Sequence, residues 1–265
     1  MFEWLKQLFG RVTGSTPATK PGSPGGSVEP GNGVSSFHLW WQGVDGGLPL
    51  VEVAATFEVL HAPTANRLYF WAMQTSFLDG KRSYGAAHIG LQWNPKHPAS
   101  RAVNWGGYGD TGNVQSVLPG SPSPLPSKPN DPNTRDYPWK ERVAYRLRIS
   151  KAQQGWRGEI TDVSTGVVQH IRDLYGGGDR LGGFAVWAEV FAACDHPSST
   201  VRWSAFEARD SAGLVHRPQS VRLTFPTGGD CTNTEVVSDG VGLLQLTNAT
   251  RTARDGAVVP VPGTG

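Results

Sequence analysis

The sequence predicts an all-β protein, an antiparallel two-sheet sandwich of the jelly-roll type preceded by a short amphipathic helix. The composition combines 34 Gly, 20 Pro and 10 Trp with only 17% charged residues, which favours many short strands and turns over long surface helices. From Ser35 to Arg251, apolar and polar residues alternate with a period of two, as on strands that bury one face. About ten to twelve such strands, without a fixed repeat, indicate a sandwich rather than a propeller.

The first 12 residues have a helical pattern instead. Their apolar positions recur at spacings of three and four and are Phe2, Trp4, Leu5, Leu8, Phe9 and Val12. An isolated helix of about 12 residues is marginal in water, so we expect a protein partner, a membrane surface or the chain's own domain to cover this docking helix. A frayed extension is the alternative.

The remaining chain divides into three parts. Residues 13–34 are rich in Gly, Pro and Ser and predict a disordered linker. Residues 35–251 form the predicted sandwich domain, with a hairpin at Asp79-Gly80 and a long irregular stretch at 94–136 that has room for one or two short strands. Residues 252–265 are predicted to be a disordered tail.

Charge and cysteine content narrow the function classes. The formal net charge is +2, without a block of like charges, which argues against nucleic acid as a partner. The sequence predicts no metal site and no cofactor. Cys194 and Cys231 are compatible with a disulfide and equally with two buried thiols. The N-terminus lacks a secretory signal, so the chain as written is expected to be cytoplasmic; non-classical export or a trimmed secreted chain are the alternatives.

Four segments carry a resemblance. IGLQWN, NWGGYGDTG, YPWKERVAYRLRIS and GWRG resemble an uncharacterised family of bacterial β-sandwich domains of the lectin and glucanase type, over roughly residues 66–205. The resemblance implies a concanavalin-like or jelly-roll fold and a connection with glycans. It assigns no catalytic residues.

The candidate site lies on the stretch LGGFAVWAEVFAACD, residues 181–195. Its inward parity is apolar, which turns a carboxylate and two aromatic rings outward. Sugars stack on aromatic rings and need paired hydrogen-bond donors and acceptors. The predicted ligand-binding residues are Trp187, Glu189, Phe191, Trp40, Tyr84, His88 and Gln92. The alternative is that one sheet packs under the long stretch 94–136, so that these aromatic residues form a second small core, and that Glu189 pairs with Arg146 or Arg148.

These features favour a non-catalytic carbohydrate-binding or surface-recognition domain, in which Trp187→Ala or Trp40→Ala would abolish glycan retention without lowering the melting temperature. A polysaccharide-acting glycoside hydrolase or lyase is a second hypothesis. A hydrolase needs a second carboxylate beside Glu189, and Glu58, Asp195 and Glu207 are eligible for this role by strand parity alone. A third hypothesis is a cargo or assembly protein docked through residues 1–12.

Overall fold

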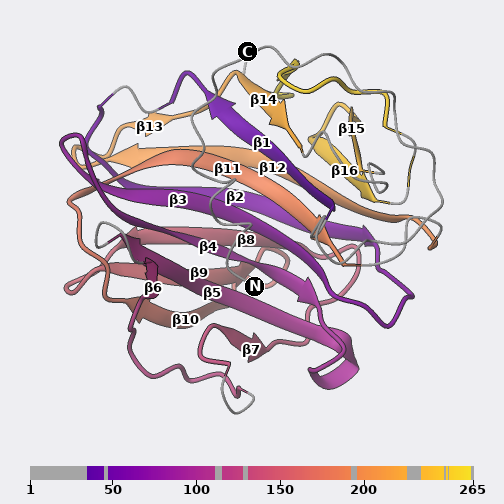
Figure 1. The fold of residues 1–265 in the computed structure, drawn as a ribbon, viewed down its shortest axis with the longest axis horizontal. Coiled ribbons are helices and arrows are strands. Elements are labelled where there is room, and N and C mark those ends of the chain that lie inside the picture. The colour runs from indigo at the N-terminus through magenta and orange to yellow at the C-terminus, as the bar shows by residue number, and fades with distance from the viewer. Residues whose placement is uncertain are drawn as a thin grey trace.

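The chain folds into two antiparallel β-sheets packed face to face (Figure 1). This computed structural model describes residues 35–44, 47–110, 115–127, 131–191, 196–225, 234–247, 249 and 251–263. The predicted all-β, two-sheet antiparallel sandwich is confirmed. The predicted helix, the linker and both cysteines lie outside the described residues.

Sheet A has the strand order β17-β14-β1-β11-β3-β4-β5-β6, and β7 pairs with β5. Its strands are β1 (Ser35–Gln42), β3 (Tyr69–Asp79), β4 (Arg82–Trp93), β5 (Arg101–Asp110), β6 (Gln115–Val117), β7 (Thr134–Asp136), β11 (Arg180–Val190), β14 (Ser220–Thr224) and β17 (Val258–Pro260).

Sheet B has the order β10-β9-β8-β2-β12-β16-β15, and β13 pairs with β12. Its strands are β2 (Leu50–His61), β8 (Ala144–Lys151), β9 (Trp156–Asp162), β10 (Val168–Leu174), β12 (Ser199–Asp210), β13 (Val215–His216), β15 (Glu235–Ser238) and β16 (Leu243–Thr247). The one helical turn within the described residues is the 3-10 helix η1 (Pro98–Ser100), and no described helix is long and apolar enough to cross a membrane.

The main core fills the space between the sheets. Alternate residues of each strand enter it, as the two-residue period predicts; on β1 these are Phe37, Leu39 and Trp41. Large rings from both sheets meet here: Trp71 of sheet A lies 5.9 Å from Phe57 of sheet B, centroid to centroid. This packing fixes which face of each strand points away from the other sheet.

The predicted hairpin at Asp79-Gly80 is confirmed. Asp79 pairs with Arg82 at the end of the β3–β4 ladder, and Gly80 has a positive φ of 55°. A glycine reaches this backbone region without a steric penalty, which is why the dipeptide was informative. The hairpin sets β3 and β4 side by side along most of their length.

Two segments differ from the sequence-based expectation. The stretch 94–136 contains β5, a ten-residue strand in the ladder of sheet A. The glycines of β5 suggested a loop, but in the structure they let the backbones of β4 and β5 lie close together. A Cβ on Gly107 would lie 2.5 Å from the carbonyl oxygen of Ala86. The predicted tail contains β17, which pairs with β14 through Val259 and Val221.

Candidate functional site

The outer face of sheet A, the face turned away from sheet B, carries the candidate site. Strand register aligns its side chains in rows that cross β11, β3, β4 and β5. The rows are Glu189–Phe70–Gln92–Ala102, Trp187–Ala72–Gly90–Asn104 and Ala185–Gln74–His88–Gly106. On the other side of β11, β1 adds His38 opposite Trp187 and Trp40 opposite Ala185.

Aromatic rings gather around Trp187 at the middle of this face. Its ring centroid lies 4.8 Å from Phe70, 5.6 Å from His88 and 6.0 Å from His38. Trp40 stacks on His38 at 5.8 Å. Offset and edge-on contacts at these distances are favourable aromatic geometries, so the rings hold one another in place.

Burial corrects the expected exposure of the site. Trp187 and Glu189 face away from the main core as predicted, yet each is only 2% exposed. Trp187 belongs to a separate small hydrophobic cluster with Phe70, Ala72 and Ala185, and Trp40 packs against that cluster. A second small core therefore exists on this face, although the stretch expected to cover it contributes strand β5 to the same sheet. The expected exposure of Trp187 and Glu189 was wrong, whereas their role in ligand binding stays a prediction.

Two of the predicted ligand-binding residues lie apart from this cluster. Phe191 follows the end of β11 and is 41% exposed. Tyr84 is the extra residue at a register shift between β3 and β4, where Phe77 pairs with Gly85 and Leu78 with Ser83. This bulge breaks the parity that was assumed for Tyr84, whose ring packs against the main core. The structure brings together Trp40, His88, Gln92, Trp187 and Glu189.

Glu189 has an unusual electrostatic environment. Its burial raises the pKa of its carboxyl to about 8, because desolvation disfavours the charged form. The alternative pairing with Arg146 or Arg148 is wrong: both arginines belong to sheet B and bind other acids there. Within the described part of the chain, the Glu189 carboxyl makes no hydrogen bond or ion pair. At pH 7 it is therefore mostly protonated.

The two histidines of the face are also neutral at pH 7. Burial lowers the pKa of His38 and that of His88 to about 4 in each case. Since the Glu189 carboxyl is neutral as well, the centre of the outer face of sheet A carries no net charge near pH 7. Glu189, His38 and His88 therefore offer no opposite charge to a charged ligand near pH 7.

Several polar groups of this face keep unused hydrogen-bonding capacity. The Asn94 amide donates to Oε1 of Gln92 at 2.9 Å, which leaves Nε2 of Gln92 without an acceptor among the described residues. Gln74 has no side-chain partner there either, and the buried Nε1 of Trp187 has none. Both glutamines are only 4% exposed. Among these atoms, Nε1 of Trp187 is itself fully buried without a partner, and buried polar groups are nearly always satisfied, so this indole needs an explanation.

A second carboxylate for glycoside hydrolysis is absent near Glu189 in the described chain. Glu58 and Glu207 lie on sheet B, each in an ion pair with an arginine. Asp136 lies in the same cross-strand row as Glu189, but four strand spacings away. With about 4.8 Å between neighbouring strands, the separation is about 19 Å. Glycosidase carboxylates are about 5 to 10 Å apart. Asp195 lies outside the described residues.

Metal binding finds no support in the described residues, where no group of three or more His, Cys, Asp or Glu side chains could hold an ion. This applies to the outer face of sheet A as well. Its carboxyl, amide and imidazole groups are spread over separate strands among aromatic rings. The chemistry that this arrangement offers is hydrogen bonding and ring stacking.

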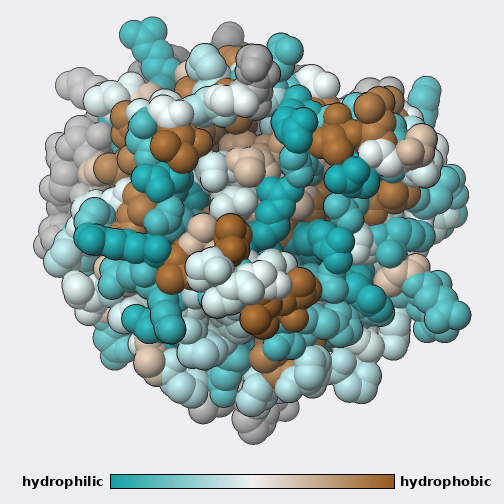
Figure 2. All heavy atoms as spheres, turned by 180° about the vertical axis from the view of Figure 1, so that it is seen from behind, coloured by the Kyte–Doolittle hydropathy of each residue, from teal (hydrophilic) through white to brown (hydrophobic). Residues whose placement is uncertain are grey.

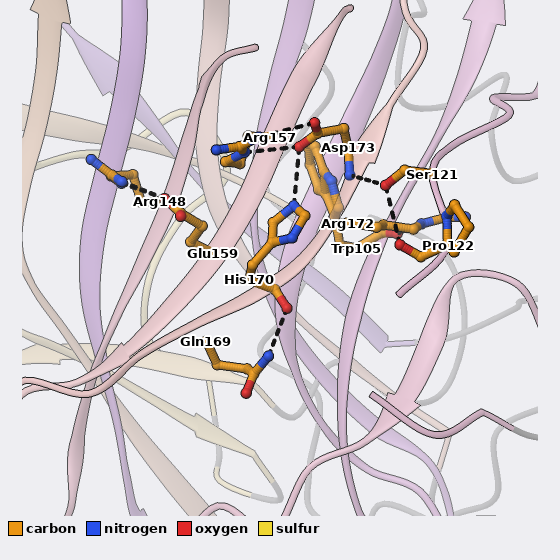
Figure 3. Close-up of polar contacts among 10 residues, drawn as sticks. All are labelled: Trp105, Ser121, Pro122, Arg148, Arg157, Glu159, Gln169, His170, Arg172 and Asp173. Atoms are coloured by element: carbon orange, nitrogen blue, oxygen red, sulfur yellow. Dashed lines mark hydrogen bonds and ion pairs between the residues drawn. The ribbon is translucent and has the colours of Figure 1, made fainter. Parts of the chain in front are cut away.

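The outer face of sheet B differs in kind. It is seen in Figure 2, where hydrophilic side chains alternate with hydrophobic ones. Arg202 binds Glu58 at 2.7 Å and Arg146 binds Glu207 at 2.6 Å. At the edge of the sheet, Figure 3 shows a third group, in which Arg157 and His170 both point at the Asp173 carboxylate, 2.9 and 3.1 Å away. These ionic groups are partnered within the protein.

Sequence reasoning missed two members of the site on β3, Phe70 and Gln74. The strand reads YFWAMQTSFLD, with apolar residues on both parities, so the pattern alone did not distinguish its faces. Gln74 was the available signal, because a glutamine inside an apolar strand is uncommon. Its position beside His88 follows only from the register of β3 against β4.

Comparisons with known proteins show no family for this chain. No family model and no curated protein match the sequence. Among solved structures, Scytalido-glutamic peptidase with a peptide-based transition state analog is similar at 10% identity and a TM-score of 0.40, covering 81% of this chain and 97% of that one. SCP-B, a member of the Eqolisin family of peptidases, gives 8% identity and a TM-score of 0.41 over the same shares.

A third similar structure is the full-length tailspike protein 2 of an Escherichia coli O157:H7 bacteriophage, at 14% identity and a TM-score of 0.32. That match covers 74% of this chain but only 27% of the tailspike. At such identities and TM-scores, none of these three structures bears on the fold or the activity of this chain.

Proposed function

We propose that the outer face of sheet A binds a neutral carbohydrate without turning it over. The observation that supports this most is the buried, unpartnered Nε1 of Trp187, which lies on the same face as three largely buried side chains with polar atoms that have no described partner: the Glu189 carboxyl, the Gln74 amide and Nε2 of Gln92. A ligand with several hydroxyl groups would supply the missing donors and acceptors, since each hydroxyl can do both.

The rings and the charge state support the same ligand class. Trp187, Phe70 and Trp40 offer apolar surface next to the unsatisfied polar groups, which is the combination that the C–H faces and hydroxyls of a sugar require. A protonated Glu189 donates as well as accepts, and neutral histidines add no charge. An uncharged sugar therefore suits the site better than an acidic or basic one.

The proposal is tested with Glu189→Met on an array of neutral oligosaccharides. Met keeps nearly the same length and removes both hydrogen-bonding atoms, and no described partner of Glu189 is left stranded. The matched control is Glu207→Met, the same change on the outer face of sheet B. We expect retention of the wild type and of Glu207→Met and loss of retention for Glu189→Met. Equal retention of all three proteins, or no retention of the wild type, would contradict the proposal.

Acid-catalysed hydrolysis is a second candidate function, favoured by one observation. A carboxyl with a pKa of about 8 holds its proton at neutral pH, as a general acid must. Glu189→Gln separates the two functions, because an amide still donates and accepts hydrogen bonds but transfers no proton. If the site is catalytic, this variant retains oligosaccharide binding and loses release of reducing sugar. If it only binds, neither protein releases sugar.

A further inference from the structure

We propose that the edge of the sandwich between β7 and β10 holds a binding site for a phosphate or sulfate group, formed by Arg135 and Arg172. This site is separate from the outer face of sheet A. β7 is attached to sheet A through β5, and β10 is the edge strand of sheet B. Both strands lie at the lower side of the sandwich in Figure 1, so each sheet contributes one arginine.

Strand register places both arginines on the inner faces of their sheets. Arg135 pairs with Val103 of β5, whose side chain lies in the main core. Arg172 pairs with Gly158 of β9, at which a Cβ would lie 2.6 Å from the ring of the core residue Trp105. Paired residues of neighbouring strands share a face of the sheet. The two side chains therefore start from the inner faces, and they are only 6% and 4% exposed, respectively.

The two guanidinium groups are held by uncharged acceptors. Nε of Arg172 donates to the carbonyl oxygen of Trp105 at 3.2 Å, and Nη2 donates to Oδ1 of Asn133 at 2.5 Å. Figure 3 shows Arg172 beside Trp105. Nη1 of Arg135 donates to the carbonyl oxygen of Asp131 at 3.1 Å and to that of its own preceding residue at 2.9 Å. Within the described part of the chain, neither arginine makes an ion pair.

The positive charge at this edge is not fully compensated. Burial and, secondly, the nearby charge of Arg135 lower the pKa of Arg172 to about 10, and burial also lowers the pKa of Arg135. Asp131 is the one described acid whose charge acts against this on both groups, and residues 128–130, Lys-Pro-Asn, contain no acid. Both arginines stay charged at pH 7. Because an uncompensated buried charge is costly, a bound anion would stabilise this edge.

The unused donors suit a tetrahedral oxyanion. Nη1 of Arg172, Nε and Nη2 of Arg135 and Nδ2 of Asn133 have no acceptor among the described residues. None of these nitrogens is enclosed, in contrast to Nη1 and Nη2 of Arg251, which are buried without a partner. Gly120 puts no side chain against Nη1 of Arg172, from which a Cβ would lie 3.3 Å away. A phosphate or sulfate group offers at least three acceptor oxygens to such donors, whereas a carboxylate offers two.

Isothermal titration calorimetry with inorganic phosphate at constant ionic strength tests the site in the full-length chain. The variant is Arg135→Met, and the matched control is Arg157→Met on β9, whose guanidinium is already paired with Asp173 at 2.9 Å. We expect saturable binding by the wild type, the same affinity in Arg157→Met, and an affinity lower by about tenfold or more in Arg135→Met. No saturable binding by the wild type, or equal affinity in all three proteins, would overturn the proposal.

A second measurement does not depend on the folding of Arg135→Met. In the wild type labelled with nitrogen-15, inorganic phosphate should shift the NMR signals of Asn133 Nδ2 and Arg172 Nε and leave that of Arg157 Nε unchanged. Glucose 6-phosphate distinguishes the source of the group: equal shifts identify a phosphate ester as a ligand, and shifts with inorganic phosphate alone identify the free ion. Shifts confined to Arg157, or none with either compound, would overturn the proposal.

Discussion

On the outer face of sheet B, arginines and acids bind one another across neighbouring strands, whereas on the outer face of sheet A a glutamic acid, two glutamines and a tryptophan are buried with hydrogen-bonding capacity to spare. Arg202 contacts Glu58 and Asp239 at 2.7 Å each. Glu189 has no such partner in the described chain, and burial raises its pKa to about 8.

The polar side chains of the outer face of sheet B find their partners within the protein, whereas those of the outer face of sheet A do not find them among the described residues. Partly exposed ion pairs add little stability each, but they leave no polar group unsatisfied. A buried carboxyl without a partner costs free energy, and such a cost is typical of functional sites. Both faces come from the same strand alternation, so their side chains and not their backbones make the difference.

Among the substitutions that compare the two faces, Trp187→Ala is expected to cause the largest loss of unfolding free energy. Trp187 is packed among Phe70, His38 and His88, and truncating a buried tryptophan costs about 3 to 5 kcal/mol of unfolding free energy. Urea denaturation measures this loss. The sequence-based expectation of an unchanged melting temperature was made for an exposed ring and does not hold for a buried one. A loss below about 1 kcal/mol would show that the ring is not packed as described.

The next effect is the pH dependence of the free energy of unfolding, compared between the wild type and Glu189→Gln. The folded-state pKa of Glu189 is about 8 against an ordinary 4.5, so the unfolded chain loses this proton first and stability falls as pH rises from 4.5 to 8. Relative to Glu189→Gln, wild type should lose about 1.4 kcal/mol per pH unit across this window. Denaturation curves at several pH values measure the difference, and a constant difference would contradict it.

The histidines of the same face act in the opposite direction. Their folded-state pKa is about 4, below the ordinary 6.5. The unfolded chain therefore binds protons that the folded chain does not, and stability is lost as pH falls from 6.5 to 4. Because both proteins in the comparison keep His38 and His88, this contribution cancels in the difference and leaves the Glu189 term.

The smallest effect is expected on sheet B, for Arg202→Met. Its pairs with Glu58 and Asp239 are partly exposed, so their loss should cost about 1 kcal/mol or less. Denaturation in low and high salt measures it, and the wild-type advantage should shrink at high salt because ions screen the pairs. A loss as large as that of Trp187→Ala would remove the distinction between the faces.

The sequence predicted the sandwich and part of the site for one physical reason. Side-chain parity on a strand is local, so Trp187, Glu189, His88 and Gln92 could be assigned to outer faces before any pairing was known. Parity failed at Tyr84, where a bulge inserts one residue, and at β5, where glycines serve close strand contacts. Side-chain parity does not predict how deeply the outer-face side chains are buried. It also does not predict the register that places Gln74 beside His88, or the sheet to which Arg146 belongs.

The protonation of Glu189 is the most direct test of this account. The side-chain carboxyl carbons of the glutamates are labelled with carbon-13, the Glu189 signal is assigned by its absence in Glu189→Gln, and its chemical shift is followed from pH 4 to 9 in the full-length protein. We expect a midpoint near pH 8. A midpoint near the ordinary value of 4.5 would show that the carboxyl is solvated or paired, and would contradict the claim that this face holds a neutral, unpartnered acid for a ligand.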